Sequence, residues 1–401
     1  MAEPFENFKV SLKPEETLLL YCARTQMDAA HVEQVLKLLQ NNIDWDSLIE
    51  MAYHHNVASL LYRNLESIAS AMVPEAVRTS LKQQIQKDVQ GNLSLTKELL
   101  FLLGLFDQHG IQVIPYKGPV LSTSVYHDLA LRSFGDLDIL VHEHDVLRAM
   151  DLLVSCGYEI IRPNSVIQVR KSLRSFWIKQ LINKSPWAYQ LILWNPEREG
   201  IVEIHWRIMS KYAFPRRATQ LWDGLKPVTV GGNTFLSFSP ENLLWFLCLH
   251  GAKHQWRELR HLCDVAELLR EYPDLDWERV MAEAAELGVE RRLYLGLYLA
   301  CFVLDAPLPL AIQTKMSAMP PIKILAEQVM ESLFDDREQP TTSEFVRQLA
   351  FQLKAMDRLG DRVLYFLRFF RRIDAAMTAE RKFIKRFSFL SLSSRLLKLL
   401  T

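Results

Sequence analysis

The chain has 401 residues, 49% of them hydrophobic, and its 47 basic side chains balance 47 acidic ones. This composition excludes a collagen, a disordered protein and a small disulfide scaffold. At about 100–200 residues per domain, the length predicts two or three domains, and the zero net charge predicts no global field that would attract nucleic acid.

Three features indicate a cytoplasmic protein. The five cysteines are far apart and form no CxxC pair, which favours thiols in a reducing compartment over disulfides or zinc ligands. The N-terminal sequence is acidic and interrupted by prolines, so no signal peptide is expected. The longest uncharged apolar run, Leu293 to Leu304, is much shorter than the roughly 18 residues of a membrane span, so no transmembrane helix is expected.

Helical and strand-like patterns alternate along the chain. Residues 15–105 place apolar side chains at spacings of three and four, so residues 1–94 are assigned to an N-terminal helical region. After Pro240 the same spacing returns, and residues 228–401 are assigned to a C-terminal helical region.

The central residues, 95–227, have a different pattern of residue types. Short runs rich in β-branched and aromatic residues predict strands over 111–116, 135–141, 158–162, 188–194 and 200–206. Predicted helices over 119–127 and 144–155 separate some of these strands. Strands mixed with helices indicate an α/β or α+β core between the two helical regions.

Carboxylates on two of the predicted strands carry the functional signal. Asp136 and Asp138 are two residues apart, so a strand points both to one face, and Glu203 and His205 have the same relation on a later strand. Neighbouring carboxylates repel each other unless a cation lies between them, and oxygen ligands favour Mg²⁺ or Mn²⁺. If the two strands are adjacent, three carboxylates form a two-metal site of the kind used in nucleotidyl transfer. His205 is expected to bind the nucleotide, or it could equally be a structural histidine that packs on Trp206.

Residues upstream of Asp136 are candidates for binding phosphate. Lys117 and Gly118 lie between a predicted strand and a helix that begins near Pro119, where backbone amides and the lysine favour an anion. Arg132 lies in the turn before the metal-bearing strand, where it could bind a phosphate or pair with a carboxylate.

These motifs resemble those of a known family. The K-G pair at 117–118, Leu121, Tyr126, Arg132, the run GDLDILV at 135–141 and the run VEIHW at 202–206 are similar to the uncharacterised nucleotidyltransferase family of bacteria. That family resembles a branch of the DNA polymerase β-like nucleotidyltransferase superfamily. The resemblance covers about residues 15–310, and its specific motifs lie between residues 116 and 206.

The resemblance implies an α+β fold with a small mixed-sheet nucleotidyltransferase core. It also implies that Asp136, Asp138 and Glu203 are the catalytic residues that bind magnesium. Lys117 and Gly118 match a position where related enzymes have a glycine-serine pair facing the triphosphate. The serine is missing here unless Ser122 or Ser124 replaces it.

A second stretch, LCLHGAKHQWRELRHLCDVAELL, resembles the helical segment that follows the core in the same family. His250 and His254 are four residues apart and share a helix face, with Arg257 close behind. We expect these side chains to line the nucleotide or acceptor pocket. Structural packing is the alternative, and zinc binding is a weaker one because no third ligand is evident.

Two segments are locally basic. Residues 162–188 have six basic and no acidic side chains, and residues 361–401 have a net charge of +7 from ten basic and three acidic side chains. The first could hold an anionic acceptor or a nucleic acid, or it could be a solvated amphipathic helix. The second could lie on an anionic membrane surface, or it could dock on the protein itself.

The combined interpretation is a metal-dependent nucleotidyltransferase that uses Mg²⁺ or Mn²⁺. It is expected to transfer a nucleoside monophosphate from a nucleoside triphosphate to a small molecule, a protein side chain or a nucleic acid, with pyrophosphate release. One alternative is a non-catalytic nucleotide-binding sensor or scaffold on the same fold. The other is a membrane-surface or partner-binding protein that uses the basic C-terminus.

Overall fold

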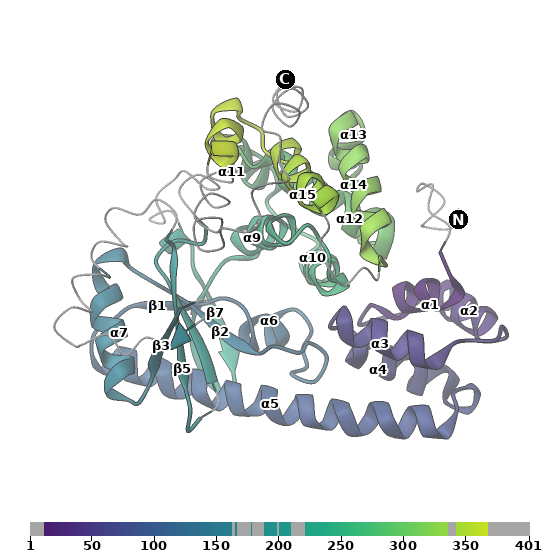
Figure 1. Ribbon diagram of the computed structural model, residues 1–401, viewed down its shortest axis with the longest axis horizontal. Helices are drawn as coiled ribbons and strands as arrows, with labels where there is room; N and C mark the ends of the chain where they lie inside the picture. Colours follow the sequence, from purple (N-terminus) through teal and green to yellow (C-terminus); the bar gives the residue numbers. More distant parts are fainter. Residues whose placement is uncertain are drawn as a thin grey trace.

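The protein has an α+β fold, and the computed structural model in Figure 1 shows a mixed sheet at one side of the molecule. In the chain, this sheet lies between an N-terminal and a C-terminal group of helices. The structure describes residues 12–162, 165–166, 178, 188–198, 200–209, 221–335 and 342–367. Most of the basic segment 162–188 and nearly all of the basic C-terminal segment lie outside these ranges. Within the described ranges, no helix combines the length and hydrophobicity needed to cross a membrane.

The N-terminal region is helical, as predicted. Its short helices are α1 (Pro14–Cys22), α2 (Ala29–Leu38), α3 (Trp45–His54) and α4 (Ala58–Ala69), with a 3-10 turn, η1, at Ser70–Met72. Asp28 and Asp44 begin α2 and α3, where each carboxylate accepts a hydrogen bond from a backbone N–H in the first turn. Such caps satisfy donors that have no partner within the helix.

A single long helix, α5 (Glu75–Gln108), connects this region to the sheet (Figure 1). Its 34 residues span roughly 51 Å at 1.5 Å per residue. Leu99, Leu102 and Phe106, near its C-terminal end, are buried against the sheet. The boundary predicted after residue 94 therefore falls within one helix, and the division into domains stays a prediction.

The main sheet has the strand order β1-β2-β6-β5-β3-β4. Its strands are β1 (Val113–Pro115), β2 (Asp136–Val141), β3 (Glu159–Arg162), β4 (Ser165–Val166), β5 (Gln190–Asn195) and β6 (Gly200–His205). β2 and β6 are parallel neighbours, and the other pairs are antiparallel. All five predicted strands are present, and the two that carry the carboxylates are adjacent, as the predicted site requires.

Helices α6 (Pro119–Ser124) and α7 (Val146–Ser155) lie where helices were expected, and the 3-10 turn η2 (Glu143–Asp145) precedes α7. The helix predicted to reach His127 ends earlier, at Ser124. His127 has a φ of +56°, a conformation that does not continue a right-handed helix.

The two faces of the sheet have different chemistry. Leu137, Ile139, Val202 and Ile204 point to one face, where they share a hydrophobic core with α5 and α7. Because side chains alternate along a strand, Asp136, Asp138, Glu203 and His205 point to the opposite face. This second face is turned toward the C-terminal helices.

A β-hairpin that was not predicted leads into those helices. Its strands are β7 (Lys226–Val230) and β8 (Asn233–Ser237), joined by Gly231 and Gly232 with φ values of +56° and +80°. Glycine adopts these values without strain. The Ser237 hydroxyl donates a hydrogen bond to the Pro115 carbonyl at 2.7 Å, which fixes the hairpin to the end of β1.

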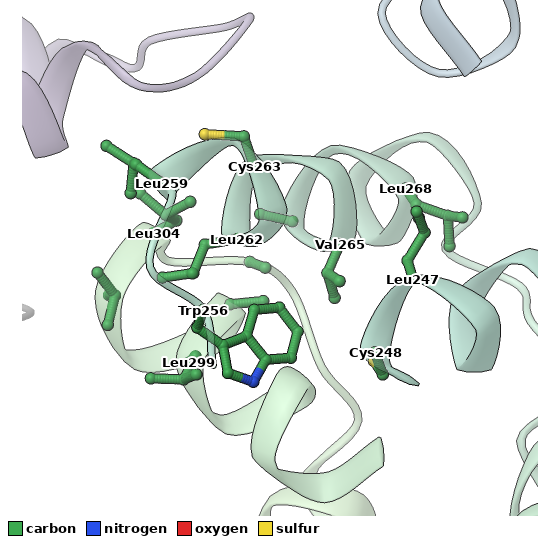
Figure 2. Close-up of a cluster of buried hydrophobic side chains, with 14 of the residues drawn as sticks. Leu247, Cys248, Trp256, Leu259, Leu262, Cys263, Val265, Leu268, Leu299 and Leu304 are labelled. Carbon is green, nitrogen blue, oxygen red and sulfur yellow. The ribbon is translucent and has the colours of Figure 1, made fainter. Parts of the chain in front are cut away.

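From Pro240 on, the described part of the C-terminal region is helical, as predicted, whereas residues 228–237 of the assigned region belong to the hairpin. The helices of this region are α9 (Pro240–Lys253), α10 (Leu259–Glu271), α11 (Trp277–Leu287), α12 (Glu290–Leu304), α13 (Leu310–Ser317), α14 (Pro320–Leu333) and α15 (Thr342–Lys354). Figure 2 shows the centre of its core, where Trp256 lies among Leu, Val and Cys side chains of α9, α10 and α12. The same core continues into α1 and α4, so the two helical regions pack on each other.

Candidate active site

The site begins at the register between two parallel strands. Asp138 of β2 lies directly beside Glu203 of β6. Asp136 is two residues earlier on β2, so its side chain points to the same face. Parallel pairing puts the two neighbouring side chains on the same face. Asp138, Glu203 and His205 each offer a ligand atom, and these atoms all lie within 4.8 Å of one another. Asp136 lines the same pocket but is not part of this group.

Charge around Asp138 is balanced by two neighbours. Lys117 Nζ lies 3.3 Å from Asp138 Oδ1, and His205 Nε2 lies 3.1 Å from the same oxygen. Burial acts to raise the pKa of Asp138, but Lys117 and His205 overcome this effect and hold it well below its usual range. Burial raises the pKa of Asp136, and the negative charge of Asp138 raises it further.

Local backbone geometry explains how Lys117 reaches Asp138. Gly118 precedes α6 with a φ of +51°, and a Cβ atom there would lie 3.3 Å from the backbone oxygen of Asp136. Only glycine accommodates both the positive φ and this approach easily. The chain therefore turns sharply after β1 and places the lysine over the carboxylates. Binding of a triphosphate by Lys117 and Gly118 stays a prediction.

The pocket has a volume of about 220 Å³, and side chains of α9 and α10 form its second side. We use the name helical wall for the five basic or histidine side chains on this side, which are His250, Lys253, His254, Arg260 and His261; Phe246 and Glu258 line the pocket beside them. The three imidazole rings have centroids 4.6 to 5.4 Å apart. Burial first, and nearby cations second, lower the pKa values of His250 and His261 far below the usual histidine value, so both rings are neutral at pH 7.

His250 and His254 therefore lie where they were expected, beside the pocket. In the part of the chain that the structure describes, neither belongs to a group of converging metal-ligand atoms, so the zinc alternative gains no support. Arg257 is not among the described residues that line the pocket, and Arg260, one turn further on, lines it instead. His261 and Arg260 were missed because only the packing of α10 against α9 brings them to the pocket.

Arg132 lines the pocket, but its guanidinium group forms an ion pair with Asp264. Its Nε and Nη2 donate hydrogen bonds to the two carboxylate oxygens of Asp264, at 2.7 and 2.9 Å. Of the two roles considered for Arg132, pairing with a carboxylate is observed, although the partner comes from α10 instead of the metal-bearing strand. Its part in phosphate binding stays a prediction.

The residues present fit a divalent cation. Among the described residues, Asp138 Oδ2 is buried and has no hydrogen-bond partner, and His205 Nε2 faces carboxylate oxygens of Asp138 and Glu203 at 3.1 and 3.2 Å. Buried polar atoms are normally paired, so the unpaired oxygen of Asp138 is available as a ligand, and a cation could be shared by the converging atoms of Asp138, Glu203 and His205. Gln190 of β5 donates a hydrogen bond to Glu203 Oε2 at 2.8 Å and so orients the second carboxylate.

The fold and the pocket define the class of protein. Carboxylates on adjacent strands, opposite a wall of cationic and histidine side chains, are suited to holding a divalent cation against phosphates. A family model described as "Uncharacterised nucleotidyltransferase" matches residues 41–305, more than half of the chain, so the protein belongs to that family. This confirms the resemblance to the uncharacterised nucleotidyltransferase family. No curated protein and no solved structure matches the chain.

Proposed function

We propose that the protein is a metal-dependent nucleotidyltransferase that transfers a nucleoside monophosphate from a nucleoside triphosphate to an acceptor. The observation that carries this proposal is the side-by-side placement of Asp138 and Glu203, with Asp136 two residues earlier on β2 and Lys117 Nζ at 3.3 Å from Asp138 Oδ1. Family membership supports nucleotidyl transfer as the reaction class. The free cysteine thiols are consistent with the predicted cytoplasmic location.

The residues have distinct parts in this mechanism. Asp136, Asp138 and Glu203 hold the cation, which when bound neutralises phosphate charge and activates the attacking oxygen. The acceptor oxygen forms a bond to the α-phosphorus while the bond to the β-phosphate oxygen breaks, and pyrophosphate leaves. Lys117 supports the phosphates, and the helical wall contacts the nucleotide. Most of the rate enhancement comes from positioning and charge neutralisation.

The test is pyrophosphate release from each ribonucleoside triphosphate with Mg²⁺ or Mn²⁺, in the presence of cell extract as the acceptor source. We expect Asp138→Asn to abolish release, because an amide replaces the buried carboxylate beside Glu203. The control is Asp107→Asn, the same change at an exposed position of α5. Circular dichroism checks that both variants fold.

Two outcomes would count against the proposal. Full release by the folded Asp138→Asn variant would contradict the assignment of this site. Metal-dependent nucleotide binding without release from any nucleotide would favour the non-catalytic sensor.

A further inference from the structure

His205 lies at the centre of the carboxylates. It follows Glu203 by two residues on β6, so both side chains point to the same face. Its Nε2 atom is 3.1 Å from Asp138 Oδ1 and 3.2 Å from Glu203 Oε2. The side chain is only 5% exposed.

Aromatic neighbours fix the direction of the ring. Tyr116 packs against it edge-on with ring centroids 5.8 Å apart, and the tilted ring of Tyr189 has its centroid 6.1 Å away. Among the described residues, the ring nitrogen Nδ1 is buried without a hydrogen-bond partner, whereas Nε2 faces the two carboxylates. An ion pair with the two carboxylates is one use of a nitrogen in this position.

The distances indicate a different use for Nε2. Three donor atoms converge here: one oxygen from each of two carboxylates and the ring nitrogen. We propose that His205 Nε2 is a ligand of the same cation that Asp138 and Glu203 hold, and that this ligand makes the site prefer Mn²⁺ over Mg²⁺.

The preference follows from the chemistry of the ligands. Mg²⁺ is bound almost entirely by oxygen and keeps much of its water, whereas imidazole is a common ligand of first-row transition metals. Two carboxylates and one imidazole therefore suit Mn²⁺, which accepts both oxygen and nitrogen. This inference rests on the proposed function, because it assigns the identity of the cation at the same site.

The experiment uses the full-length protein and Mn²⁺ alone, without nucleotide. Pulsed electron paramagnetic resonance detects magnetic coupling between Mn²⁺ and a directly bound ¹⁴N nucleus. We expect the wild type to show coupling to one imidazole nitrogen. We expect His205→Gln to lose this coupling, to bind Mn²⁺ roughly tenfold or more weakly, and to lose less affinity for Mg²⁺.

His254→Gln is the matched control, because His254 lines the same pocket but does not belong to the converging group. It should keep the nitrogen coupling. If His205→Gln does not fold, His205→Asn replaces it, and wild-type protein with ¹⁵N-labelled histidine shows independently whether the coupled nitrogen belongs to histidine.

The outcomes separate the two proposals. Mn²⁺ binding without nitrogen coupling, or coupling that survives in His205→Gln, overturns the role of His205 and leaves the proposed function standing. Failure of the wild type to bind either Mn²⁺ or Mg²⁺, with or without nucleotide, overturns both.

Discussion

One buried carboxylate, that of Asp264, holds together parts of the chain that lie far apart in sequence. It accepts two hydrogen bonds from Arg132 and a third, at 2.8 Å, from the Tyr126 hydroxyl. Burial acts to lower the pKa of Arg132, but Asp264 more than offsets this and raises it above its usual value. The pair thus ties α10, which carries part of the helical wall, to the turn before β2.

We predict that Asp264→Asn destabilises the protein by about 3–5 kcal/mol, because it leaves the Arg132 charge buried without its counter-ion. The control is Glu66→Gln, which removes an exposed ion pair to Arg78 and should cost about 0–1 kcal/mol. Urea unfolding followed by circular dichroism gives both values. A loss in Asp264→Asn no larger than the control loss would show that the pair does not hold the turn.

At the scale of elements, α9 and α12 approach closely around one indole ring. Trp256 is fully buried, and it follows α9 in a link where it has a φ of +56° (Figure 2). A Cβ atom on Gly251 would lie 2.4 Å from the Trp256 ring, and one on Gly296 would lie 2.5 Å from Cys248 Sγ. These glycines therefore make room for the ring, and the position of the helical wall depends on this packing.

We predict that Gly251→Ala destabilises the protein by about 1–3 kcal/mol, although alanine is the better helix former, because the new methyl group overlaps the indole. Gly104→Ala in α5 is the matched control, since a Cβ atom there meets nothing within 4 Å. It should stabilise by roughly 0.5–1 kcal/mol. Thermal and urea unfolding would contradict the packing argument if both variants shifted stability in the same direction.

At the scale of the whole molecule, the N-terminal helices are fixed to the beginning of α10. The backbone N–H groups of Leu259 and Arg260 donate to the ring nitrogen Nδ1 and the carbonyl of His55, at 3.4 and 3.2 Å. The ring is almost completely buried. Burial, and then the nearby His54, lower the pKa of His55 to about 4.

This shift makes stability depend on pH. Because the folded pKa lies below the unfolded value of about 6.5, the unfolded state binds more protons between these values, and stability falls as the pH falls through this window. We predict that His55 contributes a loss of about 2 kcal/mol between pH 7 and pH 5. His55→Asn should show a smaller loss over this range in urea unfolding. His144→Asn, at an exposed position, should match the wild type.

Much of the fold could be predicted from the local spacing of apolar residues in the sequence. The five central strands and the helical regions on both sides follow from periodicities of two and of three to four, which the backbone geometry of strands and helices imposes directly. The β7–β8 hairpin was missed although its signal is present, since Gly231 and Gly232 separate two strand-like runs. The carboxylate face was equally readable, because Asp136 and Asp138, like Glu203 and His205, are separated by one strand repeat.

The sequence by itself therefore determined which side chains share a face, because that depends on dihedral angles within a few residues. Only the tertiary structure decided which faces meet. The parallel register of β2 and β6 placed Asp138 beside Glu203. Helix packing paired Arg132 with Asp264, which is 132 residues away in sequence, and brought Arg260 and His261 to the pocket. Those contacts depend on how whole helices and strands pack, and a local periodicity does not encode the packing of distant elements.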